Sequence, residues 1–146
     1  MEVGVRPATD DDAAVLAAMA AAAIAEQVDG RGGRVWSARE ALRRPGEDGA
    51  TFVGTIDDAP VGYADVDVER LGDGSLLGVV SGIYVDPGAR EVAVGEALID
   101  EVLSWCTARG CVGVDAHALP GNRATKNFFE TFGFTARLLV VHRSLR

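Results

Sequence analysis

The sequence predicts an α+β fold built on a mostly antiparallel sheet. Short runs of alternating apolar and polar residues predict strands, and turn-forming residues join several of these runs directly. Longer runs with apolar residues spaced three or four apart predict helices beside the strands. At 146 residues the chain is long enough for one core, so we expect a single domain over residues 1–146.

The composition excludes several classes of protein. Hydrophobic residues make up 48% and charged residues 25% of the chain, which is typical of a globular protein. The alanine-rich run at residues 13–25 is too short to span a bilayer, and no basic signal-peptide start precedes it. We therefore expect a cytoplasmic protein with no membrane partner. The net charge of −8 argues against nucleic acid as a partner.

The cysteines and histidines do not predict a metal site. Cys106 and Cys111 fall on an expected helix and strand, where we expect buried thiols instead of a disulfide. His117 and His142 are the only histidines, and no metal-ligand spacing links them to the cysteines.

The N-terminal third is expected to hold a strand at residues 2–7 and a helix that runs to about residue 28. Thr9 and Asp12 resemble a capping box at the start of that helix. A glycine-rich loop at residues 29–35 then leads to a short helix over residues 37–44, capped by Ser37. This region holds candidates for contact with a substrate, although a solvated loop is the alternative: Arg31, Arg34 and Trp36.

Two further strands are expected at residues 50–56 and 61–69, around a turn at residues 57–60. The second strand alternates cleanly and places an acidic row on one face. That row either attracts an amine or simply faces solvent. Its members, with the tyrosine that precedes them, are Tyr63, Asp65, Asp67 and Glu69.

The C-terminal half alternates strands and helices. After a hairpin turn at residues 72–75, the pattern predicts the following order: strand 76–85, helix 92–109, strand 111–118, helix 122–132 and strand 136–144. Gly110 and Gly133 are expected to end the two helices. Asp86, Pro87 and Gly88 break the first of these strands just before a helix begins, and a helix N-terminus suits a phosphate group.

The spacing of Val85, Pro87, Arg90, Ala93 and Gly95 resembles the acyl-CoA-binding motif of the GCN5-related N-acetyltransferase (GNAT) family. In that family the backbone amides of this segment hold the pyrophosphate of coenzyme A. Ala93 stands where the family has its first motif glycine, and Glu91 stands where glycine or a basic residue is common. The resemblance assigns acetyl-CoA to these residues: Ile83, Tyr84, Val85, Arg90, Glu91, Val92, Ala93, Val94, Gly95 and Glu96.

A second block, from Gly121 to Phe134, resembles the other conserved segment of the family. Asn122 matches the family residue that reaches the pantetheine arm, although it could also be a helix N-cap. Phe129 matches the position of the tyrosine that commonly protonates the departing thiolate. The resemblance implies a GNAT-like fold, in which the sheet splays between two parallel strands and carries helices on both faces.

Two parts of the chemistry depart from the family pattern. Phe129 has no hydroxyl, so Tyr84 or water must serve as the acid, or the protein binds acyl-CoA without efficient turnover. Val79 occupies the position of a glutamate that serves some members as the base. His117 is the nearest candidate base because its unperturbed pKa of about 6.5 suits neutral pH. Asp115, on the same face, either orients it or is solvated.

The resemblance therefore implies an N-acetyltransferase that transfers an acetyl or acyl group to a small amine or a peptide amino group. Direct attack in a ternary complex is expected, because no activated cysteine or serine is apparent. One alternative is a non-catalytic acyl-CoA-binding sensor or accessory module, and another is a nucleotide-binding domain. The apolar residues 138–141 could pair with a second copy, so a homodimer is plausible.

Overall fold

Five strands form one sheet in the order β1-β2-β3-β4-β5 in the computed structural model, which describes residues 1–40, 45–90 and 92–146. The first four strands pair antiparallel, and β4 pairs parallel with β5. Their bounds are β1 Val3–Pro7, β2 Ala50–Ile56, β3 Ala59–Arg70, β4 Leu76–Val85 and β5 Gly113–Ala116. The predicted α+β class with a mixed, mostly antiparallel sheet is confirmed.

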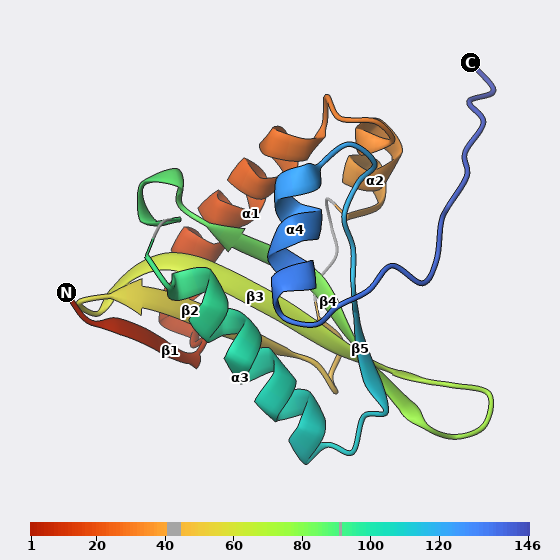
Figure 1. Ribbon diagram of the computed structural model, residues 1–146. Helices are drawn as coiled ribbons and strands as arrows, with labels where there is room; N and C mark the ends of the chain where they lie inside the picture. The colour runs from red at the N-terminus through yellow and green to blue at the C-terminus, as the bar shows by residue number, and fades with distance from the viewer. Residues whose placement is uncertain (41–44, 91) are drawn as a thin grey trace.

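Helices cover both faces of this sheet (Figure 1). The helices are α1 Ala13–Gln27, α2 Gly33–Glu40, α3 Val94–Ala108 and α4 Arg123–Thr131, and short 3-10 turns span Asp10–Asp12 and Pro87–Ala89. One face packs on α3 through a core that includes Val94, Leu98, Val102 and Cys106. The other face packs on α1, where Met19 meets the buried rings of Tyr63 and Tyr84.

Glycines in the sheet allow α3 to lie close to it. A Cβ atom on Gly54 would lie 2.6 Å from Cγ1 of Val94, and one on Gly78 would lie 2.5 Å from Sγ of Cys106. Real Cβ contacts are not this short, so both positions need glycine for packing. The close approach fixes where the N-terminus of α3 lies against the sheet.

Two predicted elements near the N-terminus are corrected by the structure. Residues 33–35 are helical, so α2 begins at Gly33 and not at Ser37. The helix starts earlier because Gly32 adopts a φ of 74° and the Trp36 N–H donates to the Gly32 carbonyl. Ser37 is therefore buried inside the helix and does not cap it. Residues 41–44, the end of the predicted helix, lie outside the described residues.

The predicted strand at residues 136–144 is wrong. The segment that contains these residues leaves the body of the molecule as an extended chain (Figure 1). Its apolar side chains are 75% to 85% exposed and comprise Leu138, Leu139, Val140 and Val141. Apolar, β-branched composition predicts strand character, but a strand also requires a hydrogen-bonded neighbour, and no strand of the described chain supplies one here.

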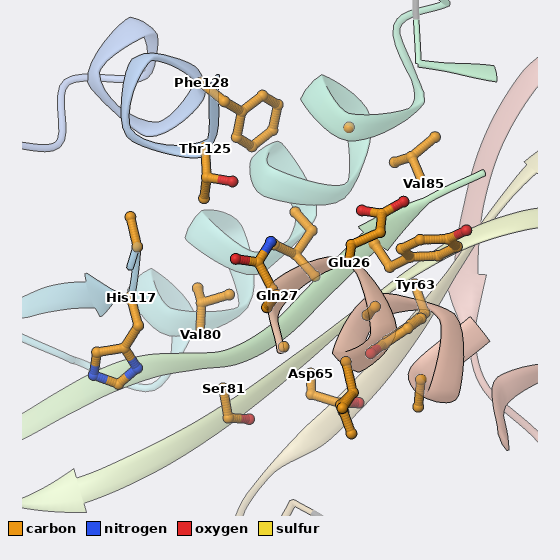
Figure 2. Close-up of a pocket in the computed structure, with 18 of the residues that line it drawn as sticks. Glu26, Gln27, Tyr63, Asp65, Val80, Ser81, Val85, His117, Thr125 and Phe128 are labelled. Atoms are coloured by element: carbon orange, nitrogen blue, oxygen red, sulfur yellow. The ribbon is translucent and has the colours of Figure 1, made fainter. Parts of the chain in front are cut away.

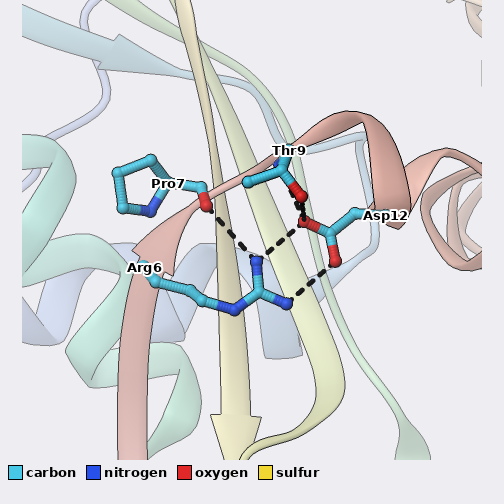
Figure 3. Close-up of polar contacts among 4 residues, drawn as sticks. All are labelled: Arg6, Pro7, Thr9 and Asp12. Carbon is cyan, nitrogen blue, oxygen red and sulfur yellow. Dashed lines mark hydrogen bonds and ion pairs between the residues drawn. The ribbon is translucent and has the colours of Figure 1, made fainter.

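An ion pair joins β1 to the start of α1 (Figure 3). Nη1 and Nη2 of Arg6 donate to the two carboxylate oxygens of Asp12 at 2.7 and 2.8 Å, and the Thr9 backbone N–H donates to Oδ2 at 2.8 Å. The predicted capping box of Thr9 and Asp12 is confirmed. The hydrogen bonds from Arg6 and Thr9 hold the pKa of Asp12 well below its usual range.

We predict that Asp12→Asn lowers the thermal unfolding midpoint and flattens its dependence on acid pH. The folded-state pKa is depressed, so the stabilisation is present above the unfolded pKa of about 3.9 and is lost as the pH falls through the folded-state value. Thermal melts between neutral pH and pH 3 measure this effect. Asp11→Asn is the matched control, because Asp11 lies exposed in the same turn. Equal melting curves for the two variants would contradict the assignment.

Candidate functional site

A cavity of about 810 Å³ opens where β4 and β5 diverge. The parallel ladder ends at the pair Val80 and Ala116, whereas β4 continues to Val85. Side chains of α1 and α4 form the facing walls, and Trp36 of α2 closes one side. Figure 2 shows this lining, with Glu26 and Gln27 entering from α1 and Thr125 and Phe128 from α4. The predicted splay between two parallel strands is confirmed.

A β-bulge shapes the floor of the cavity. Pairing between β3 and β4 passes from Asp65 with Gly82 to Val66 with Val80, so Ser81 is an extra residue on β4. Such a bulge bends the strand and increases its twist. Beyond Val80, the edge of β4 that faces β5 has no strand partner in the described chain. Backbone groups on that edge are therefore available to an extended ligand.

Most of the predicted donor-binding residues line this cavity. They are Ile83, Tyr84, Val85, Arg90, Gly95, Asn122 and Phe129. The remaining predicted residues in the described chain lie just outside the lining: Val92, Ala93, Val94 and Glu96. Val94 is fully buried in the core, and its backbone N–H donates to the Val92 carbonyl at 2.6 Å. Glu91 lies outside the described residues.

The backbone at the start of α3 accommodates an alanine at position 93, where the family motif has a glycine. Ala93 has φ −67° and ψ 31°, which an alanine adopts without strain, so this position does not require glycine. Gly95 has a packing role instead. A Cβ atom on Gly95 would lie 3.0 Å from Cε1 of Phe128, so the glycine allows α4 to approach α3. The Val94 N–H donates to the Val92 carbonyl, whereas the next N–H groups at the start of a helix generally lack an acceptor within the helix.

Arg90 is held at the mouth of the cavity by three contacts. Its Nε donates to the Val85 carbonyl at 2.8 Å, and its Nη2 donates to Oε1 of Glu26 at 2.6 Å. Its guanidinium carbon lies 5.4 Å from the centroid of the Tyr84 ring. Burial, with the nearby Asp86 and Glu26 carboxylates, raises the pKa of Tyr84. The phenol therefore stays protonated at neutral pH.

Asn122 is both the N-cap of α4 and part of a bridge to α1. Its Oδ1 accepts from the Thr125 backbone N–H at 3.2 Å, as the capping alternative predicts. Its Nδ2 donates to Oε1 of Gln27 at 3.0 Å. Because the cap fixes the orientation of the amide, the NH₂ group is the part of Asn122 that faces α1.

His117 lies exposed at the end of β5, on the border between the main cavity and a second hollow. Asp115, one of the residues that line the second hollow, forms a bidentate ion pair with Arg137, with Nε to Oδ1 at 2.7 Å. That pair lowers the pKa of Asp115. The sequence left two alternatives for Asp115, that it orients His117 or that it is solvated. The structure shows a third arrangement, in which Asp115 pairs with Arg137.

The acidic row on β3 divides between the two hollows. Asp65 lines the main cavity and accepts from Oγ1 of Thr51 at 2.5 Å, whereas Asp67 and Glu69 line the second hollow. The row is therefore not a uniform solvent face. Trp36 lines the main cavity, but Arg31 and Arg34 do not.

Sequence reasoning missed several residues that the structure brings into the cavity. They are Glu26, Gln27, Thr51, Ser81, Thr125 and Phe128. Glu26 and Gln27 end an alanine-rich helix whose pattern specifies its buried face only weakly. A bulge at Ser81 has no signal in the alternation of a buried strand. Phe128 could have been inferred from Gly95, because a glycine in the first turn of a helix often marks a close contact.

Neither a membrane-spanning helix nor a metal-binding cluster is present in the described part of the chain. No helix there combines the length and apolar character needed to cross a bilayer. Among the same residues, no group of three or more His, Cys, Asp or Glu side chains is arranged to hold a metal ion.

A model of the Acetyltransferase (GNAT) family matches residues 17–134. Two aminoglycoside N(6')-acetyltransferases type 1, from Salmonella typhimurium and Salmonella enteritidis, are each 28% identical over 89 residues. That alignment covers 58% of this chain and 61% of each relative, so the chain spans less than two thirds of their length.

Solved structures of acetyltransferases share the fold. The aminoglycoside N-acetyltransferase AAC(6')-Iy in complex with CoA aligns with a TM-score of 0.75 at 19% identity, over 99% of this chain and 96% of that one. Glucosamine-6-phosphate N-acetyltransferase from Arabidopsis thaliana aligns with a TM-score of 0.72 at 16% identity, over 100% of both chains. The family match runs from within α1 to just beyond α4, and the chain therefore belongs to the GNAT acetyltransferase family.

Proposed function

We propose that residues 1–146 act as one N-acetyltransferase domain that transfers an acetyl group from acetyl-CoA to a small amine. The observation that carries the proposal is the cavity between the diverging strands β4 and β5. It presents an unpaired strand edge, a cation and a helix N-terminus along one continuous surface. A thioester on a long amide-containing arm that ends in phosphates needs this combination of groups.

Each part of the donor has a candidate partner. The open edge of β4 after Ser81 offers backbone N–H and C=O groups to the amides of the pantetheine arm. Arg90 and the first amides of α3 offer positive charge to the pyrophosphate. The Asn122 side-chain amide lies on the opposite wall, where it can donate to the arm. Val92, Ala93 and Glu96 take part through the backbone in this proposal, whereas Val94 only packs in the core beneath them.

The reaction is direct transfer in a ternary complex. The neutral amine attacks the thioester carbonyl, the C–S bond breaks, and the coenzyme A thiolate takes up a proton as the amide forms. A covalent route through cysteine is disfavoured by the described residues. Cys106 is buried, and burial raises its pKa to about 11, while Cys111 does not line the cavity.

His117 and Asp65 are the candidate groups for removing the proton from the amine. His117 borders the cavity at the end of β5, and Asp65 pairs with Gly82 beside the bulge. A carboxylate at Asp65 also attracts a cationic amine before deprotonation. We propose His117 as the base, because it is reachable from solvent, with Asp65 positioning the incoming ammonium.

We propose an amino sugar as the acceptor. The two Salmonella relatives are named aminoglycoside N(6')-acetyltransferases, and an amino sugar carries the cationic amine that the acidic row would attract. Asp65, Asp67 and Glu69 extend this acidic character from the main cavity into the second hollow. A peptide amino group is the competing acceptor that a substrate panel would reveal. A cytoplasmic location and the absence of nucleic-acid partners stay predictions.

A non-catalytic acyl-CoA-binding module is the second candidate, and Phe129 is the observation that favours it. Phe129 is 5% exposed on the cavity wall and packs against Phe128 and Phe134, so it brings no hydroxyl to the thiolate. Binding of coenzyme A without turnover on any amine would support this second function.

We predict that Arg90→Gln weakens coenzyme A binding about tenfold or more, because a hydrogen bond to a charged group is worth about 1.5–3 kcal/mol. Isothermal titration calorimetry measures the dissociation constant. Arg109→Gln is the matched control, since Arg109 is an exposed arginine at the far end of α3, stacked on Trp105. Equal binding by both variants, or binding of ATP without coenzyme A, would contradict the proposed donor site.

We predict that Phe129→Tyr raises kcat with little change in KM for acetyl-CoA, because the added hydroxyl would protonate the thiolate. The gain should be smaller than the roughly 10²- to 10⁴-fold that general acids typically contribute, since a thiolate leaves readily. Phe132→Tyr is the matched control, since Phe132 ends the same helix and does not line the cavity. Steady-state kinetics with an amino sugar measures both, and an unchanged or lower kcat for Phe129→Tyr would show that no acid is needed here.

We also propose that the chain forms a homodimer through residues 138–141. These apolar side chains lie exposed, and the outer edge of β5 has no strand partner in the described chain. Arg137 anchors the segment next to that edge through Asp115. A second copy offers the same extended segment and the same edge, so reciprocal pairing would satisfy both.

The dimer predicts twice the chain mass by light scattering at micromolar concentration. Leu139→Glu should shift the mass to that of one chain, because a buried carboxylate would be placed in the new interface. Arg143→Glu, further along the same extended segment, is the control for the added negative charge. A wild-type mass of one chain would refute the dimer.

A further inference from the structure

Glu26 and Gln27, at the end of α1, accept hydrogen bonds from Arg90 and Asn122, two polar residues that the sequence motifs assign to donor binding. Oε1 of Glu26 accepts from Nη2 of Arg90 at 2.6 Å, across 64 positions of sequence. Oε1 of Gln27 accepts from Nδ2 of Asn122 at 3.0 Å, across 95 positions. Figure 2 shows Glu26 and Gln27 entering the cavity from α1. One turn of one helix thus spans the cavity to both of its ligand-binding walls.

The groups that α1 engages are those that a donor would need. Arg90 already uses Nε on the Val85 carbonyl, and its guanidinium carbon lies over the Tyr84 ring. Asn122 uses Oδ1 to cap α4. Nη2 of Arg90 and Nδ2 of Asn122 therefore face α1, and Glu26 and Gln27 each accept one hydrogen bond from these groups.

We propose that Glu26 and Gln27 form a latch that competes with the acyl donor for Arg90 and Asn122, and that donor binding releases the end of α1. This inference rests on the proposed function of the cavity. A phosphate oxygen would replace the Glu26 carboxylate on Arg90, and a carbonyl of the donor arm would replace the Gln27 amide on Asn122. Glu26 and Gln27 are positioning residues, because they act on the donor through Arg90 and Asn122.

Release of the latch has a consequence for the acceptor. The end of α1 leads through the Gly30 and Gly32 turn into α2, whose Trp36 lines the same cavity. Movement of α1 therefore reaches the wall that an acceptor would contact. The latch predicts that donor binds before acceptor, because only the donor displaces Glu26 and Gln27.

The size of the effect follows from the exposure of the ion pair. The side chains of Arg90 and Glu26 are 44% and 38% exposed, so the pair is a partly solvated one of modest strength. Removing it should increase the fraction of molecules that are ready to bind. We expect Glu26→Gln to tighten coenzyme A binding by about two- to fivefold. Gln27→Ala should also tighten coenzyme A binding.

Calorimetric titration with coenzyme A itself tests the latch in the wild type, Glu26→Gln and Gln27→Ala. Glu130→Gln is the charge-matched control, since Glu130 forms an exposed pair with Lys126 on α4, outside the cavity lining. Tighter binding by the two latch variants, with no change for Glu130→Gln, is the expected result. Unchanged or weaker binding by Glu26→Gln would overturn the latch, because it would show that Glu26 does not compete with the donor.

A double-mutant cycle separates competition for Arg90 from a general loss of negative charge. In an Arg90→Gln background, Glu26→Gln should no longer tighten binding if Glu26 acts through Arg90. A gain that persists in that background would overturn the mechanism. Failure of the wild type to bind coenzyme A at all would instead refute the proposed function, and with it the latch.

Trp36 offers a second readout that does not depend on affinity. The chain contains two tryptophans, so Trp105→Phe leaves Trp36 as the single emitter. Saturation with coenzyme A should shift the emission of Trp36 in this background. In the same Trp105→Phe background, Glu26→Gln should shift the Trp36 emission of the ligand-free protein part of the way toward its value in the coenzyme A complex. Emission that is unaffected by either change would contradict release of α1.

Discussion

Parallel pairing between β4 and β5 stops at Val80 and Ala116, and the remaining length of β4 has no second neighbour in the described chain. Two local features cause this divergence. The bulge at Ser81 bends β4, and the chain after Ala116 turns away through His117 toward α4. A sheet that opens in this way exposes backbone groups that are normally paired, and helices α1 and α4 wall off the opening. The strand edge, the start of α3 and the Asn122 cap meet in one cavity because of it.

Packing on the two faces of the sheet keeps this opening in place. On one face, Gly54 and Gly78 allow α3 to pack closely, which sets the position of its first turn beside Val85. On the other face, α1 packs on the rings of Tyr63 and Tyr84 and is tied to β1 through Asp12 and Arg6. The end of α1 then reaches across the cavity to Arg90 and Asn122. The contacts that stabilise the fold and those that shape the site therefore share the same elements.

Much of this arrangement could be predicted from the sequence, and the exceptions have physical reasons. Alternation and turn residues located every strand of the sheet, and the motif spacing placed Arg90, Gly95, Asn122 and Phe129 near one another. The strand predicted at residues 136–144 failed because apolar composition cannot specify a pairing partner. The contacts of Glu26 and Gln27 could not be foreseen either, since they join positions 64 and 95 residues away along the chain. Long-range side-chain contacts of this kind leave no periodic signal.

In the proposed function, the open edge of β4 presents a thioester to an amine. The most direct test is the release of free coenzyme A from acetyl-CoA by the wild-type protein, measured with and without an amino sugar. Release should depend on the amine and saturate with it, and an acetylated product should form in matching amount. Tight binding of acetyl-CoA with no amine-dependent release, across amino sugars and peptide amines alike, would contradict the proposed transferase and favour a binding module.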